Sequence, residues 1–255
     1  MIYIDKALKA FDEYVKNYNP EDEKIMLKIN HIKRVSKISR NMAIDLNLSE
    51  EDKNLAELIG ILHDIGRFEQ IRIYNTFMDK DSVNHGKLGV KILFEDGLIR
   101  NFVKDTKYDD IIKKAILNHN AGKIEEGLTD RELLHSKIIR DSDKTDIYNV
   151  LINESVEACY NVSDMSKEVI TEEIYREFNE EHIINYKNIK TAADVLVAHF
   201  AYVFDYNFSY GLKLLEDKKY LDSLYNKFKF EDEKTQERFY EVYKIAKNYV
   251  IDILK

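Results

Sequence analysis

The chain of 255 residues contains one proline and eight glycines, is 44% hydrophobic and carries a formal charge of −8 at pH 7. So few turn-forming residues argue against a turn-rich β-fold, and the 12 Phe and 17 Tyr exclude a disordered chain. The negative charge disfavours non-specific nucleic-acid binding. The lone Cys159 cannot form an internal disulfide, and the longest uncharged apolar run, Val195–Phe204, is too short for a membrane span. We expect an all-α, soluble, cytoplasmic protein.

Apolar spacing predicts three helices in the first quarter of the chain. The first covers Ile2–Val15, and the second starts after an Asn-Pro stop, with Pro20 in its first turn, and runs to about Leu46. Ser49 and Asp52 resemble a capping signal for the third, whose apolar stripe continues to Leu62.

A break is expected next, because Gly66 ends the apolar stripe and residues 67–84 show no sustained period. We predict a long loop there, of the kind that is often functional in compact domains. Helical spacing resumes near Asp81 or Ser82 and continues to the C-terminus. One later helix is expected to contain His119 and another to contain Asp143. Three more are expected near Lys167–Asn179, Thr191–Phe208 and Glu231–Leu254.

No linker rich in proline, glycine or serine divides the chain. We therefore predict a single domain over residues 1–255. Within it, residues 20–152 would form the core, and residues 153–255 would be accessory helices packed on that core.

Four of the seven histidines fall on separate predicted helices at positions that should point inward: His31, His63, His85 and His119. A buried histidine needs a polar partner, and four of them are hard to satisfy by ordinary core hydrogen bonds. A shared metal ion would supply those partners, since neutral imidazole and carboxylate bind Mn, Fe, Co, Ni and Zn ions. We expect the remaining histidines, His135, His182 and His199, to be structural or exposed.

The order of a histidine, a His-Asp pair and a later aspartate resembles the HD-domain superfamily of metal-dependent phosphohydrolases. Here these residues are His31, His63, Asp64 and Asp143. The two histidines that lie between the pair and the later aspartate, His85 and His119, resemble the extra ligands of the subset that binds two metals.

This resemblance implies an all-α helical bundle with additional C-terminal helices. It also implies that the first four residues hold one divalent ion, and that Asp64 bridges to a second ion held by the two further histidines. Asp143 is chosen over Asp141 as the ligand, because Ser142-Asp143-Lys144 matches the small-Asp-basic pattern of the family. Asp141 would then not bind the metal itself but would orient one of the ligand histidines. The cofactors would be Mn, Fe, Co or Ni, with Mg or Zn as alternatives.

The implied reaction is hydrolysis of a small phosphorylated metabolite or nucleotide, as a phosphohydrolase or phosphodiesterase, by a metal-activated water that Asp64 helps to position. Arg67, Arg34 and Lys144 are candidate phosphate ligands, although solvated surface charge explains the last two as well. A mixed-valent di-iron oxygenase and a degenerate anion-binding regulatory module remain alternatives. We expect no membrane partner and no specific nucleic acid. The aromatic residues from Phe200 to Tyr210 fit a core or a homodimer interface better than a nucleobase platform.

Overall fold

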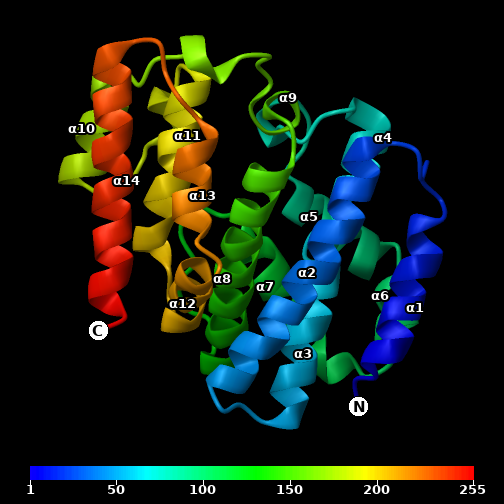
Figure 1. The fold of residues 1–255 in the computed structure, drawn as a ribbon. Coiled ribbons are helices and arrows are strands. Elements are labelled where there is room, and N and C mark those ends of the chain that lie inside the picture. The colour runs from blue at the N-terminus through cyan, green and yellow to red at the C-terminus, as the bar shows by residue number, and fades with distance from the viewer. The chain divides into compact units, whose positions relative to one another are not determined.

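The predicted all-α fold is confirmed. The computed structural model describes residues 1–255, which form α-helices with short 3₁₀ and π segments and contain no β-strand (Figure 1). The chain divides into two compact units, residues 1–143 and residues 144–255, with the boundary inside helix α8 (Asp130–Asn153). The organisation as a core with accessory helices in one domain stays a prediction. No helix combines the length and the apolar character that crossing a membrane requires.

Unit 1 is a bundle in which α2 packs against α3, and α4 and α7 both pack against α5. Its buried side chains include Ile32, Leu58, Phe68 and Ile116, which come from four different helices. The α-helices of this unit are α1 (Ile4–Val15), α2 (Glu23–Asp45), α3 (Glu50–Leu62), α4 (Ile65–Tyr74), α5 (His85–Val90), α6 (Ile99–Phe102), α7 (Asp109–His119) and the first part of α8.

The helix starts in unit 1 follow local capping chemistry. The predicted cap of α3 is present, because the Ser49 hydroxyl accepts a hydrogen bond from the Asp52 amide at 3.1 Å. The start of α2 differs from the prediction: Pro20 lies in the turn before the helix, and Asp22 caps it by accepting a bond from the Lys24 amide at 2.8 Å. The carboxylate of Asp22, two residues after Pro20, accepts hydrogen bonds from the free amides of the first helical turn, which proline cannot do.

The predicted long loop over residues 67–84 is wrong in its first part, since α4 begins at Ile65 and continues to Tyr74. Residues 75–84 are irregular apart from one 3₁₀ turn, as the prediction expected. Ile65, Phe68 and Ile71 are buried at spacings of three, a helical stripe partly hidden by the charged residues between them. A Cβ built on Gly66 would lie 2.3 Å from the carbonyl oxygen of His85. This glycine therefore permits close packing of α4 on α5 and does not end a helix.

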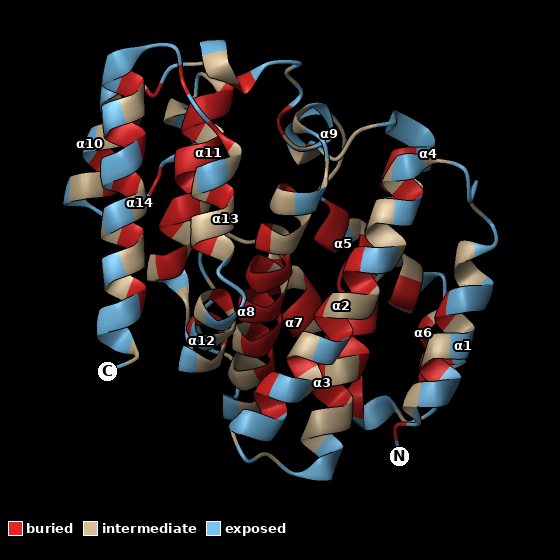
Figure 2. Ribbon diagram, viewed as in Figure 1, coloured by how far each residue is buried: buried red, intermediate tan, exposed pale blue.

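Unit 2 is built around α11, whose residues are mostly buried and which packs against α10 and α14 (Figure 2). All three predicted C-terminal helices are present, although α10 and α11 are shorter than expected, and α12 and α13 were not anticipated. The helices of this unit after α8 are α9 (Val156–Tyr160), α10 (Glu172–Glu180), α11 (Ala192–Ala201), α12 (Ser209–Asp217), α13 (Tyr220–Lys227) and α14 (Glu233–Ile253).

His199 on α11 makes the stability of the protein depend on pH. Its ring packs edge-on against Tyr160, with centroids 5.7 Å apart, and its buried Nδ1 has no hydrogen-bond partner. Burial lowers the pKa of His199 to about 4. An unfolded histidine titrates near pH 6.5, so below about pH 6.5 the unfolded chain binds a proton that the folded chain does not, and stability falls as the pH falls toward about 4.

Replacing His199 with glutamine should remove this contribution. Between about pH 6.5 and pH 4.5, the variant should lose less unfolding free energy than the wild type, by up to about 1.4 kcal/mol per pH unit. Urea denaturation across this range, without added metal, measures the difference. Parallel pH profiles for the two proteins would contradict it.

Candidate metal centre

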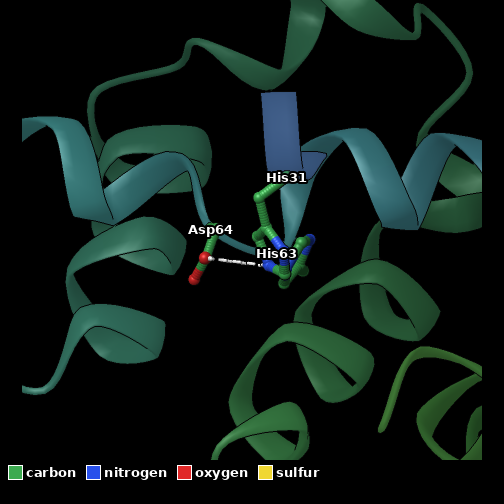
Figure 3. A group of neighbouring side chains, drawn as sticks. All are labelled: His31, His63 and Asp64. Carbon is green, nitrogen blue, oxygen red and sulfur yellow. Dashed lines mark ion pairs between the residues drawn. The ribbon is translucent and has the colours of Figure 1, made fainter. Parts of the chain in front are cut away.

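The centre is built around the break between α3 and α4. His63 follows the last residue of α3, and the chain leaves the helical path at Asp64 (φ −105°, ψ 17°) before α4 begins. Neighbouring residues on a regular helix diverge by about 100°, but here the Nε2 atom of His63 lies 3.7 Å from the Oδ2 atom of Asp64 (Figure 3). His31 from α2 points into the same place, as Figure 3 shows.

A first group of possible ligand atoms forms around Oδ2 of Asp64. Nε2 of His31 lies 3.7 Å from this oxygen and 3.0 Å from Oδ1 of Asp143, while Nε2 of His63 lies 3.8 Å from the same Asp143 oxygen. His31, His63 and Asp64 are buried, and their ligand atoms lie within 4.8 Å of one another. The structure thus brings together all four residues proposed for the first ion.

A second group forms on the other oxygen of the same carboxylate. Oδ1 of Asp64 lies 3.3 Å from Nε2 of His85 and 3.7 Å from Nε2 of His119. The two Nε2 atoms are 2.9 Å apart. Asp64 therefore belongs to both metal-capable groups, with one oxygen toward each.

Backbone hydrogen bonds fix which ring nitrogen is available. Nδ1 of His63 lies 2.8 Å from the carbonyl of Gly60, and Nδ1 of His119 lies 2.6 Å from the carbonyl of Ile116. A carbonyl only accepts, so each Nδ1 carries the proton and each Nε2 keeps its lone pair.

The electrostatics suit cation binding. Burial lowers the pKa values of His63 and His85 to about 4, so both rings are neutral near pH 7. Burial alone would raise the pKa of Asp64, but the Lys28 ammonium and the surrounding histidines hold it well below its ordinary value. Nε2 of His63 is buried without a hydrogen-bond partner. Neutral imidazoles with unprotonated, inward-facing nitrogens around an anionic carboxylate fit a divalent metal ion.

The family model of the HD domain matches residues 29–200, which is more than half of the chain. The chain belongs to the HD-domain family. Searches of curated proteins and of solved structures found no match. Most members of the HD-domain superfamily are metal-dependent phosphohydrolases, and the buried histidines and aspartates of this HD domain could bind metal ions.

Arg67, a predicted phosphate ligand of the HD site, does reach the centre. Its Nε atom lies 3.6 Å from Oδ1 of Asp64. Its Nη1 atom, however, donates to Gln70, to the carbonyl of Phe77 and to Asp79, at distances of 2.6 to 3.0 Å. The guanidinium is thus held in place by the protein, with its Nε edge toward the metal-capable carboxylate.

The other predicted residues around the HD centre are less informative. Lys144 donates to the backbone carbonyl of Asp205 at 2.8 Å and ion-pairs with the carboxylate of the same residue. Arg34 is partly exposed on α2, one turn after His31, and Asp141 is buried on α8. The phosphate-binding roles of Lys144 and Arg34 and the orienting role of Asp141 stay predictions.

Two residues at the HD centre were missed by sequence reasoning. Lys28 lies one turn before His31 on α2, and its ammonium forms an ion pair of 2.7 Å with Oδ2 of Asp64. Its spacing of three residues from His31 could have revealed it, because such residues share a helix face. Asp79, in the 3₁₀ turn η1 (Asp79–Asp81), contacts Nδ1 of His85 at 2.8 Å. No periodic signal marks a residue in an irregular connection.

Proposed function

We propose that this HD-domain chain is a phosphoric ester hydrolase that uses two divalent metal ions to act on a small phosphorylated metabolite or nucleotide. The observation that carries the proposal is the position of Asp64, whose two oxygens face two separate pairs of histidine Nε2 atoms. A carboxylate placed in this way suits a bridge between two ions.

His31, His63, Asp64 and Asp143 would hold the first ion; Asp64, His85 and His119 would hold the second. Two bound ions would supply a hydroxide from water at neutral pH and would offset charge on the phosphoryl group. The protein's part is to hold the proton on Nδ1 of His63 and of His119, through the carbonyls of Gly60 and Ile116, so that each Nε2 is unprotonated and aimed inward. No serine or cysteine nucleophile is needed in this scheme.

Positive side chains next to the carboxylate support an anionic substrate. Lys28 and Arg67 approach different oxygens of Asp64, at 2.7 and 3.6 Å. Each is mostly but not fully buried, with 14% of its side chain exposed. Cations in such positions would bind a phosphate that approaches the ions and would hold it for attack.

A metal-resolved phosphate-release screen tests the proposal. Protein stripped with a chelator would be reloaded with Mn, Co, Ni, Mg, Zn or Fe(II) in turn and mixed with a panel of phosphate mono- and diesters. We expect release that requires metal and is lost in His119→Asn. His182→Asn is the matched control, because His182 has a left-handed backbone (φ 56°) that asparagine tolerates, and it lies in unit 2 outside both metal-capable groups.

Two results would reject the hydrolase. One is oxygen consumption by the iron-loaded protein without release of phosphate, which would indicate the oxygenase. The other is a metal-loaded protein that is inert across the whole panel, which would indicate a binding module.

A further inference from the structure

The histidines of the centre are not all oriented by the same means. Nδ1 of His63 and Nδ1 of His119 each bond the backbone carbonyl three residues earlier, at Gly60 and Ile116. His85 is the first residue of α5, so the carbonyl three residues before it lies outside the helix. The helix backbone that fixes the first two rings is therefore not available to His85.

Asp79 takes the place of that carbonyl. Its two carboxylate oxygens lie 2.9 and 2.8 Å from Nδ1 of His85. The Asp79 carboxylate accepts hydrogen bonds from Arg67, Gln70 and Asn120. Because it acts here as an acceptor, Nδ1 of His85 carries the proton and Nε2 faces Asp64 with its lone pair.

The carboxylate is itself held from several sides. Arg67 and Gln70, both on α4, donate to Oδ1 of Asp79 at 3.0 and 2.9 Å, and Asn120, just after α7, donates to Oδ2 at 3.1 Å. With His85 on α5, three separate segments thus converge on this one side chain, which fixes its position.

We propose that Asp79 is a positioning residue that controls occupancy of the second metal group, by holding His85 as the Nδ1-protonated tautomer and strengthening its Nε2 as a donor to the metal. The inference rests on the two-ion centre of the proposed function. It predicts that loss of the Asp79 carboxylate weakens the second ion selectively, since the first group contains neither His85 nor a contact with Asp79. Removing such an outer carboxylate typically costs 10- to 100-fold in metal affinity.

The chain offers a matched control in Asp52. This carboxylate also binds a buried histidine and an arginine of unit 1, with Nε2 of His135 at 3.1 Å and Nε of Arg131 at 2.7 Å. The exposed fractions of the two side chains are similar, 20% for Asp52 and 29% for Asp79. Asp52→Asn therefore reproduces the structural loss of Asp79→Asn away from the metal-capable groups.

The test counts metal ions without requiring activity. Equilibrium dialysis with Mn²⁺ should give two ions per wild-type chain, one for each group. In Asp79→Asn the dissociation constant of the second ion should rise about 10- to 100-fold, and in Asp79→Ala at least as much. Asp52→Asn should match the wild type. In the metal-free protein, histidine NMR should show Nδ1-protonated His85 in the wild type and a mixture of tautomers in Asp79→Ala.

Three outcomes would overturn the inference. The wild type could bind only one Mn²⁺ ion, the dissociation constant of the second ion could be unchanged in Asp79→Ala, or Asp52→Asn could weaken the second ion as much as Asp79→Asn does. Another result would distinguish a failure of the proposed function from a failure of the positioning role of Asp79. If the wild type binds two ions but releases phosphate from no ester, the hydrolase proposal fails, while a selective loss in the Asp79 variants would still support the positioning role.

Discussion

Replacing Asp64 with alanine should abolish metal loading and reduce hydrolysis to below about 0.1% of the wild-type rate. Asp64 is the only residue shared by both metal-capable groups, so its loss removes an oxygen from each at once. Metal catalysis commonly supplies several kcal/mol of transition-state stabilisation, and about 4 kcal/mol corresponds to a thousandfold in rate. Elemental analysis of the dialysed protein and initial rates on the best ester from the screen measure the two effects.

The alanine variant also leaves the ammonium of Lys28 without its ion-pair partner. Asp64→Asn should therefore be measured alongside Asp64→Ala, because asparagine keeps the size of the side chain and can still accept a hydrogen bond from Lys28. Far-ultraviolet circular dichroism should show that both variants keep most of their helix. Asp12→Asn is the control, since Asp12 is half-exposed on α1 and forms only a surface ion pair with Lys33. Full activity with bound metal in either Asp64 variant would refute the assignment.

Gly66→Ala should lower the free energy of unfolding by about 2 kcal/mol and displace the second metal ion. The new Cβ would lie 2.3 Å from the carbonyl oxygen of His85 and 2.7 Å from the amide nitrogen of Gly89. Both are backbone atoms, so only a shift of α4 or α5 relieves the overlap. Overpacking of this kind costs about 1 to 3 kcal/mol or more, which exceeds the gain of up to about 1 kcal/mol for alanine over glycine in a helix.

The displacement of α5 should weaken metal binding at the second group more than at the first. A shift of α5 carries His85 away from Asp64, whereas His31 and His63 lie on other segments. Gly122→Ala is the matched control, because a Cβ there meets nothing within 4 Å. It should leave metal binding unchanged and alter stability by less than about 1 kcal/mol. Chemical denaturation and Mn²⁺ titration follow both effects, and a Gly66→Ala protein as stable as the wild type would disprove the packing role of this glycine.

The sequence is informative wherever a side chain repeats with the helix period. His31 and His119 could be placed on inward faces because their helices carry regular apolar stripes, and α3 could be started at Ser49 because its cap is local chemistry. Gly66 was misread for a physical reason: a glycine that ends a helix and a glycine that admits a second backbone look alike in one sequence. Asp79 was missed because its contact with His85 depends on the path of an irregular segment.

The proposed ligands come from four helices and the connection between α3 and α4, so they span most of unit 1, from His31 to Asp143. Ions bound there would act as cross-links between segments distant in sequence, in addition to any catalytic role. Because the unfolded chain cannot present these atoms together, metal at one hundred times its dissociation constant would add about 2.7 kcal/mol of stability per site. The supply of metal would then affect how long each molecule survives proteolysis, in addition to the rate of the proposed hydrolysis.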